Sequence, residues 1–373
     1  MQRHILLLVM AALSLVACKK EDTPNPSLNI PSSYNGSSFA TDAAGSLALR
    51  GQLDALVNEA KRGRNVANTV DAATLQNLYT AANPSVKSAT TAYYNGLLEG
   101  ATGWFAELAK ASGNTYTPGT PTGEGGVYGA YLFDENGLEI EQLIEKGLFG
   151  AMNFYQAQQL LRNPSIAHLH QALALYGAHP SFPNTPTASK TEHPDAHMAN
   201  YAARRSDSSN ANSLYNQIKI AFITAQAAIE QGAEFNAERD AAIANIRLNW
   251  EKVNAATIIN YCHSVIGTMS GTAPTDAQKA NALHAYGEAV GFMQGWRTLP
   301  GDSKRITDAQ IDEVLALLRA ESGQTPLSYV FITEPVVNLP RLQQVISRLQ
   351  QIYGFSNAEV ESFRNNWVNL QSR

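Results

Sequence analysis

Apolar residues recur three and four positions apart through most of the chain from residue 41 onward, and this spacing limits the fold more than any other feature. It places apolar side chains on one face of an α-helix, whereas the alternation typical of half-buried strands is nearly absent. The sequence therefore predicts an all-α fold, a multi-helical bundle with no significant sheet. We expect helices near residues 43–62, 71–82, 88–111, 137–162, 211–232, 236–269, 275–297, 307–321, 340–353 and 357–371.

Several of these helices begin at residues that can cap their free backbone N–H groups. An Asp, or a Ser or Thr followed three residues later by Glu or Gln, is the usual signature of such a start. The predicted caps are Asp71 alone and the pairs Thr275 with Gln278, Thr307 with Gln310, and Ser356 with Glu359.

A proline-rich stretch between residues 163 and 210 interrupts the helical pattern. A structureless connection of that length is uncommon inside a compact domain, unless it is functional or contains short elements that the pattern does not reveal. We expect two packed helical lobes, residues 41–165 and 211–373, joined by a loop-rich connection over residues 166–210.

The N-terminus has the organisation of a bacterial lipoprotein signal. Basic residues in Met1–His4 precede the apolar run Ile5–Ala17, which is shorter than the roughly 20 residues that span a bilayer. The run ends in Leu15-Val16-Ala17-Cys18, which resembles a lipobox. We expect residues 1–17 to be removed as a signal peptide and Cys18 to be lipidated.

Residues 18–40 follow as a polar, proline-containing flexible tether, so the chain should be anchored to a membrane without spanning it. Lys19-Lys20-Glu21-Asp22 resembles the surface-export signal of Bacteroidota lipoproteins, and a solvated spacer is the alternative. We expect the protein to be located in the outer membrane, outside the cytoplasm. It could face either the periplasm or the cell surface. The sequence contains one further cysteine, Cys262. If Cys18 is lipidated, Cys262 has no partner in the chain with which to form a disulfide.

The charge of the chain bears on its partners. Lys and Arg number 27 against 32 Asp and Glu, a formal net charge of −5. Without a basic excess, binding to a phosphate backbone has no electrostatic support, so nucleic acid is excluded as the main partner. The expected partners are the membrane, through the lipid anchor, and a protein of the envelope or of an uptake system.

Three stretches resemble a family of Bacteroidota lipoproteins catalogued as domain of unknown function 4856. They are Pro31–Tyr34 leading into Leu47–Lys61, Asn136–Leu148, and Trp250–Trp296. That family in turn looks like a distant helical relative of the imelysin-type lipoproteins, which are linked to iron uptake and named after a proposed metallopeptidase. The resemblance implies a helical, extracytoplasmic protein and leaves its activity open.

The imelysin hallmark, a His-x-x-Glu pair, is absent, because no His here has Glu three positions later. His284 and Glu288 are four positions apart, which also places them on one helical face. Such a pair could bind a ligand or do acid–base work, and a structural hydrogen bond is the alternative. His-Glu-x-x-His is absent as well, so no zincin motif supports a peptidase.

A second candidate site lies on the predicted helix over residues 137–162. Glu139, Gln142 and Lys146 are spaced i, i+3 and i+7 and share one face. If neighbouring helices cover that face, the charges need partners, and the cluster could bind a ligand. A solvated face is the alternative.

The third candidate is metal binding in the proline-rich stretch. His193, Asp195 and His197 offer ligands suited to a divalent metal, iron or zinc, and solvated loop histidines are the alternative. No phosphate-binding loop or nucleophile elbow is present in the sequence.

Together these features predict a binding protein rather than an enzyme, linked to iron or nutrient acquisition. An imelysin-like metal-dependent peptidase or hydrolase is one alternative, and a structural envelope protein is another.

Overall fold

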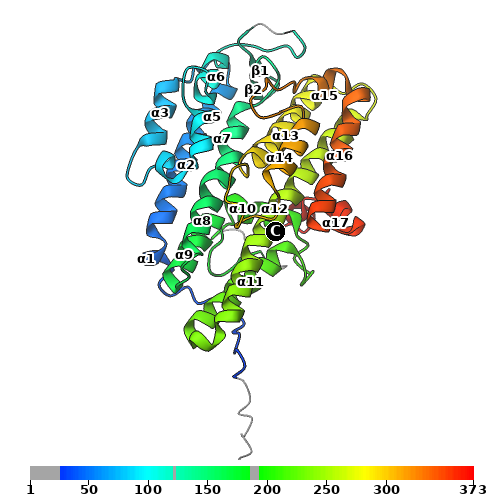
Figure 1. The fold of residues 1–373 in the computed structure, drawn as a ribbon. Coiled ribbons are helices and arrows are strands. Elements are labelled where there is room, and N and C mark those ends of the chain that lie inside the picture. Colours follow the sequence, from blue (N-terminus) through cyan, green and yellow to red (C-terminus); the bar gives the residue numbers. More distant parts are fainter. Residues whose placement is uncertain (1–25, 121–122, 185–192) are drawn as a thin grey trace, which may run out of the picture.

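The computed structural model describes residues 26–120, 123–184 and 193–373. They form an elongated helical bundle with one small two-stranded antiparallel sheet, so the predicted all-α fold is confirmed. The N-terminal segment leaves the bundle at one end, and the sheet lies at the other (Figure 1).

The first part of the chain builds one side of the bundle and the small sheet. Its elements are α1 (Phe39–Asp42), α2 (Ala44–Lys61), the 3₁₀ helix η1 (Arg62–Arg64), α3 (Ala72–Thr80), α4 (Val86–Ala89), α5 (Ala92–Leu98), α6 (Trp104–Ala111), β1 (Gly126–Tyr128) and β2 (Tyr131–Phe133).

The middle and C-terminal parts contain the longest helices. Their elements are α7 (Ile140–Leu148), the π-helix η2 (Phe149–Phe154), α8 (Tyr155–Leu160), α9 (Ile166–Tyr176), α10 (His197–Arg205), α11 (Leu214–Gln231), the 3₁₀ helix η3 (Ala233–Phe235), α12 (Asn236–Met269), α13 (Asp276–Gln294), α14 (Asp308–Leu317), α15 (Val330–Thr333), α16 (Pro335–Tyr353), α17 (Asn357–Ser362) and α18 (Trp367–Leu370).

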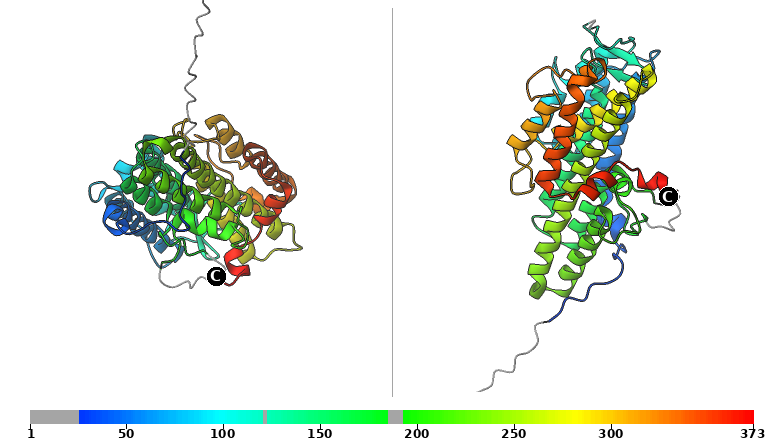
Figure 2. Two further views of the ribbon diagram at one scale, coloured as in Figure 1. Left: turned by 90° about the horizontal axis from the view of Figure 1, so that it is seen from below. Right: turned by 90° about the vertical axis from the view of Figure 1, so that its right-hand side faces the viewer.

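Helix α12 is the axis of the bundle. Its 34 residues correspond to a length of about 51 Å, and it packs against α11, α13 and α16. Helix α13 in turn packs against α7, and Figure 2 shows the helices in cross-section from below. One cluster of buried side chains extends from Tyr34 to Phe363, so both predicted lobes contribute to a shared core.

The predicted helix caps are confirmed. The Asp71 side chain accepts hydrogen bonds from the backbone N–H groups of Ala73 and Thr74. Complete capping boxes are present at Thr275 with Gln278, at Thr307 with Gln310, and at Ser356 with Glu359.

Two predicted helices are broken in the structure. Residues 88–111 were expected to form one helix but contain α5 and α6, separated near Gly100, whose φ of 96° is incompatible with a continuing right-handed helix. The helix expected over 357–371 is divided into α17 and α18.

The stretch from 163 to 210 contains two helices, α9 and α10, that the helical pattern did not predict. Leu169, Leu173, Ala174 and Leu175 are buried on several sides of α9, so the helix lacks the two-faced pattern from which helices are recognised. The pair β1–β2 was also not predicted, because each strand has only three residues. Among the described residues, no helix combines the length and apolar character needed to cross a bilayer.

Candidate functional site

A tight turn places Glu139 at the start of α7. Asp134 Oδ1 accepts hydrogen bonds from the backbone N–H groups of Asn136 at 2.9 Å and Leu138 at 2.7 Å. Gly137 has a φ of 79°, a conformation that favours glycine. Glu139 and Glu141 therefore lie at the helix N-terminus, where the helix dipole favours negative charge.

The polar face of α7 packs against a row of glycines on α13. Gly287, Gly291 and Gly295 are one helical turn apart and share one face. A Cβ atom at Gly291 would lie 2.5 Å from the carbonyl oxygen of Gln142, and one at Gly287 would lie 3.3 Å from Cβ of Glu139. The glycines thus allow the two backbones to approach closely, and the polar side chains of α7 extend past them.

These side chains belong to a closed circuit of ion pairs that we call the ion-pair ring. It alternates four basic and four acidic side chains from α2, η1, α7 and α13. In order around the ring they are Arg64, Glu139, His284, Glu288, Lys146, Glu145, Lys61 and Glu141, which returns to Arg64.

His284 lies between two carboxylates in one half of the ring. Its Nδ1 is 2.6 Å from Glu139 Oε2, and its Nε2 is 3.5 Å from Glu288 Oε2. Arg64 Nη2 donates to Glu139 Oε1 at 2.9 Å and also to Glu141 Oε2. One guanidinium group therefore holds two buried carboxyl groups.

Lysines connect the other half. Lys146 Nζ is 2.8 Å from Glu145 Oε2 and 3.4 Å from Glu288 Oε1. Lys61 Nζ donates to Glu145 Oε2 at 2.9 Å and lies 3.8 Å from Glu141 Oε1. Each lysine therefore bridges two carboxyl groups.

The charges of the ring balance only if it carries an additional proton. Four carboxylates face the three permanent cations Arg64, Lys61 and Lys146, so a neutral His284 leaves a formal charge of −1. Burial, followed by the repulsion of Glu139, raises the pKa of Glu141 to about 8. A proton on Glu141 or on His284 makes the ring electrically neutral.

For Glu145 and Lys146, in contrast to Glu141, neighbouring charges favour the ionised form more strongly than burial opposes it. Burial opposes the charged form of Glu145, but Lys146 and Lys61 outweigh it and hold the pKa of this carboxyl below its usual range. Burial also opposes the charged form of Lys146, yet Glu145 and Glu288 raise its pKa. This pair is therefore ionised over the whole physiological range.

Three of the four basic members of the ring are its most exposed side chains. The side chains of Lys61, Arg64 and His284 are 34%, 25% and 23% exposed, and we call these three residues the rim. Glu139 and Glu141 are at most 1% exposed. These two carboxyl groups thus lie inside, with the rim cations closer to solvent.

An aromatic ring covers part of the rim. Tyr131 of β2 stacks on the His284 imidazole with ring centroids 4.1 Å apart and an interplanar angle of 8°. The Arg64 guanidinium lies 5.1 Å from the centre of the same Tyr131 ring. The β-hairpin therefore fixes the orientation of two rim residues.

Five residues singled out from the sequence meet here: Glu139, Lys146, His284 and Glu288 are members of the ring, and Gln142 lies beside its member Glu141. Glu139 and Lys146 do not pair directly but are linked through His284 and Glu288. Glu139, Gln142 and Lys146 are buried, so the solvated-face alternative for this cluster is wrong. Among described residues, Gln142 Oε1 is buried without a hydrogen-bond partner, although Gln142 Nε2 donates to Glu141.

The sequence did not single out Lys61, Arg64, Glu141 and Glu145. Lys61 and Arg64 belong to a basic cluster at a helix end, which is a common solvated feature. The available signal was the concentration of acidic residues over Glu139–Glu145, since burial of so many carboxylates requires cations from another element.

The predicted metal ligands have separate partners. The His193 ring stacks on that of His179, with centroids 3.7 Å apart. Asp195 accepts a hydrogen bond from Tyr215, and burial raises its pKa to about 7. His197 Nε2 pairs with Asp54 Oδ1 at 2.9 Å.

Across residues 26–120, 123–184 and 193–373, no three His, Cys, Asp or Glu side chains form a group that could hold a metal ion. His193, Asp195 and His197 are thus not brought together as a ligand set. Cys18, the predicted lipidation site, lies outside the described residues.

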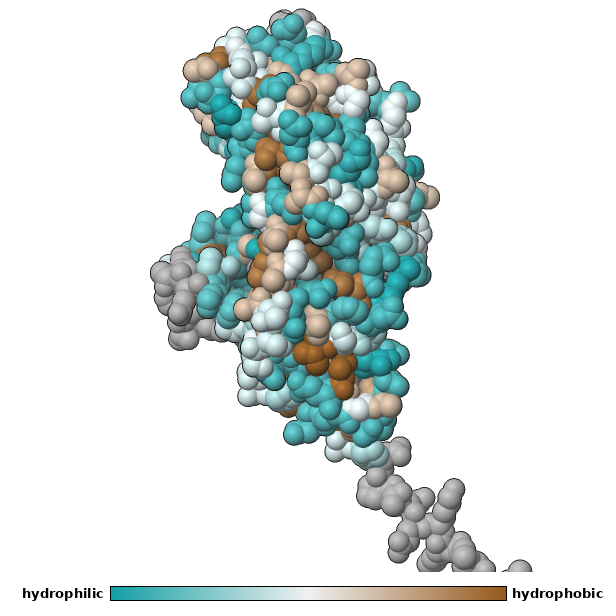
Figure 3. All heavy atoms as spheres, turned by 90° about the vertical axis from the view of Figure 1, so that its left-hand side faces the viewer, coloured by the Kyte–Doolittle hydropathy of each residue, from teal (hydrophilic) through white to brown (hydrophobic). Residues whose placement is uncertain are grey.

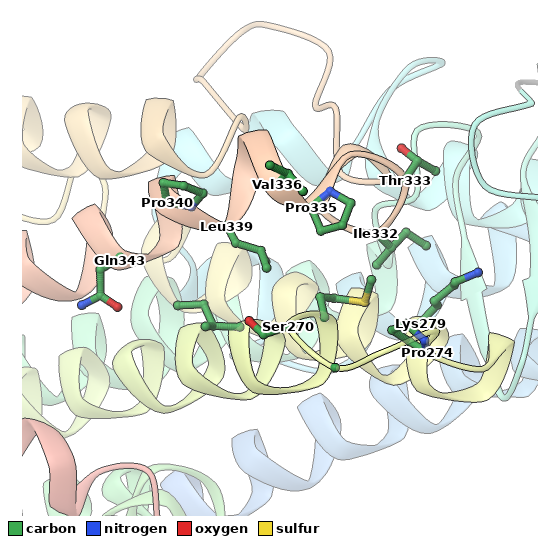
Figure 4. Close-up of a pocket in the computed structure, with 13 residues that line it drawn as sticks. Ser270, Pro274, Lys279, Ile332, Thr333, Pro335, Val336, Leu339, Pro340 and Gln343 are labelled. Atoms are coloured by element: carbon green, nitrogen blue, oxygen red, sulfur yellow. The ribbon is translucent and has the colours of Figure 1, made fainter.

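An apolar groove lies on another side of the molecule, between the C-terminal end of α12 and the start of α16 (Figure 4). Its volume is about 780 Å³. Val336 and Val337, at the start of α16, are 88% and 65% exposed. Leu339 and Ile332 point from α16 and α15 toward the helix that carries Ser270.

Comparison with known proteins identifies one family. Residues 174–355, from within α9 to just beyond α16, match the model of the family described as "Domain of unknown function (DUF4856)". The matched segment includes His284 and Glu288 but not α7. No curated protein and no solved structure matches the chain. The family expected from the sequence is thereby supported for this segment.

Proposed function

We propose that this protein is a lipid-anchored, extracytoplasmic binding protein of the outer membrane that recognises an anionic ligand at the rim. The observation that carries the proposal is the arrangement of the ion-pair ring, whose buried carboxylates hold the three basic rim residues at the surface. The positions of those cations are fixed before any ligand arrives.

The rim fits an anion better than a cation. The side chains of Lys61 and Arg64 carry N–H donors and remain partly exposed, and the His284 side chain is partly exposed as well. Arg and Lys are the side chains that recognise carboxylate and phosphate groups through charge-assisted hydrogen bonds. Because the ring already contains carboxylates that hold these cations, little side-chain ordering has to accompany binding.

A binding role agrees better with this arrangement than hydrolysis does. His284 has a carboxylate at each ring nitrogen, and those carboxylates are also paired with Arg64 and Lys146. Both ring nitrogens of His284 are therefore paired within the ion-pair ring instead of being free to activate a nucleophile. An anionic metal chelate such as ferric citrate has the charge that the rim fits, which is consistent with a role in iron or nutrient acquisition.

The anchoring part of the proposal is supported by Leu15-Val16-Ala17-Cys18 and by the polar segment that follows. Two or more acyl chains give stable attachment, so the chain needs no spanning helix. We place the helical bundle outside the cytoplasm, as in the Bacteroidota lipoproteins that the sequence resembles.

The anchor is tested by cell fractionation and intact-mass analysis of two cysteine variants. Wild type and Cys262→Ala should enter the membrane fraction with an acylated N-terminus at Cys18. Cys18→Ala should be released or remain as uncleaved precursor, because in this proposal the acyl chains on Cys18 supply the stable attachment. Cys262 is buried, so its variant is a matched control for the loss of one thiol. An unmodified Cys18 in membrane-bound wild-type protein would refute the anchor.

A further inference from the structure

The first described residues are fixed along α11. The side-chain amide of Gln231 pairs with the backbone of Asn29, accepting from its N–H at 2.9 Å and donating to its carbonyl at 2.7 Å. Gln226 pairs with the backbone of Asn35 in the same way, at 2.7 and 2.8 Å. The segment from Asn29 to Asn35 is therefore attached to the bundle, and it determines where the preceding residues leave.

An apolar groove lies beside this attachment. It has a volume of about 340 Å³, and its lining includes Ile30, Pro31, Ile220 and Ile223, with Lys219 as the one charged lining residue. Ile30 and Ile220 are 50% and 53% exposed. Figure 3 shows several hydrophobic patches on one face of the molecule, one of them near the end where the N-terminal segment leaves. Large apolar side chains exposed together often mark a surface that something covers.

The length of the chain before Pro26 limits what can cover the groove. Pro26, the first residue that the structure describes, lies eight positions after Cys18. Since a fully extended chain advances by at most about 3.6 Å per residue, Pro26 lies within about 29 Å of Cys18. An acylated Cys18, as the proposed function requires, therefore keeps this part of α11 close to the bilayer.

The end of the bundle and the side of α11 differ in how well they suit a lipid surface. The end of the bundle where α11 is followed by α12 exposes the carboxylates Glu230, Glu234, Glu238 and Asp240, which an anionic surface repels, and of these Asp240 pairs with Arg239. The side of α11 instead combines apolar Ile220 with Lys219, a residue that can place its stem among apolar groups and its charge at headgroups.

We propose that the outward face of α11 around Ile220, together with Ile30, rests on the bilayer to which Cys18 anchors the chain. This inference depends on the anchoring part of the proposed function. The bilayer contact is interfacial, with the apolar side chains at the level of the headgroups. The rim lies toward the other end of the bundle and so stays in the aqueous phase (Figure 1).

The test uses the full lipidated chain in vesicles of phosphatidylethanolamine and phosphatidylglycerol, with a nitroxide label at Ile220→Cys. Val336→Cys is the matched control, because it is also an exposed apolar position but lies on α16. Cys262 is buried and Cys18 is acylated, so the introduced thiol takes the label. Collision of the label with oxygen and with a water-soluble nickel chelate is measured by power saturation.

We expect the ratio of oxygen to nickel accessibility at position 220 to be several-fold higher than at position 336. Equal, water-like ratios at both positions in protein that floats with the vesicles would overturn this inference and leave the anchor intact. Spin–spin broadening at position 220 would assign the groove to a second copy of the chain and also overturn it. Protein that does not float with the vesicles would refute the anchor itself.

Discussion

Lys146 is the most deeply buried cation of the ion-pair ring. Its side chain is 6% exposed and lies between Glu145 and Glu288, and it also approaches the rings of Phe149 and Tyr201 at 5.6 and 5.5 Å. A buried charge of this kind is tolerated because its attraction to several partners compensates for the loss of hydration. Removing the charge therefore affects the folding of the protein as well as the site.

Lys146→Met should lower the free energy of unfolding by about 3–5 kcal/mol, because it leaves Glu288 without its closest cation. Lys279→Met, on the same helix as Glu288, removes a partly exposed lysine paired with the exposed Asp276 at 3.6 Å and should cost less than about 1 kcal/mol. Urea unfolding of both variants measures the difference. Equal stability of the two variants would contradict the structural role of Lys146.

Glu141 and Glu145 should respond to pH in opposite directions. The folded state raises the pKa of Glu141 to about 8, so this carboxyl contributes stability at low pH that is lost as the pH rises through 8. Glu141→Gln keeps the neutral form, so its melting temperature should match wild type at pH 5 and exceed it at pH 9. A melting temperature below wild type at pH 9 would disprove the sign.

The folded state lowers the pKa of Glu145, so its contribution is present above the unfolded pKa and is lost as the pH falls. Glu145→Gln should therefore be clearly less stable than wild type at pH 7, and this deficit should shrink toward pH 3. Thermal melts of both variants across the same buffers form one experiment, in which each variant controls for the other. A deficit that is constant with pH would show that the loss is not electrostatic.

At the scale of elements, the contact between α7 and α13 depends on the glycines of α13. Gly291→Ala would place a Cβ 2.5 Å from the Gln142 carbonyl oxygen and should destabilise the protein by about 1–3 kcal/mol as the helices separate. Gly267→Ala in α12 meets no atom within 4 Å and should be neutral or stabilising by up to about 1 kcal/mol. Unfolding by guanidinium distinguishes the two, and equal effects would argue against close packing of α7 on α13.

The sequence predicted the elements that have a polar and an apolar side. Amphipathic helices such as α14 and the capped start of α13 could be recognised, because both their pattern and their caps are local. Helix α9 could not, since it is buried on several sides and its pattern lacks a polar face. The short pair β1–β2 depends on contacts with α6 and α13 that no local pattern contains.

The candidate site was predictable only in part, for a similar reason. The spacing of Glu139, Gln142 and Lys146 indicated a shared face, and that of His284 and Glu288 another. Their meeting depends on the packing of α7 on α13, a contact between residues far apart in the chain. Lys61 of α2 and Arg64 of η1 enter the ring from two further elements, so only the tertiary structure reveals which cations pair with the acidic cluster.

At the scale of the whole molecule, the bundle separates its attachment from its candidate site. The N-terminal segment leaves at one end beside α11, and the ion-pair ring lies toward the end that carries β1 and β2 (Figure 1). Long helices, above all α12 with a length of about 51 Å, keep these regions apart. In the proposed lipid-anchored state, a chain of this shape would present the rim to solvent while one flank contacts the membrane.

The central claim, that the rim binds an anion, is tested most directly by isothermal titration calorimetry with citrate, ferric citrate and inorganic phosphate. Wild type should bind at least one of them saturably, and Lys61→Gln and His284→Gln should each weaken that binding by roughly 10- to 100-fold, the range for loss of one charge-assisted hydrogen bond. Lys87→Gln removes an equal charge from a partly exposed lysine that pairs with Glu99 outside the ring and should bind as wild type does. No saturable binding by wild type, or equal affinity in all four proteins, would contradict the account.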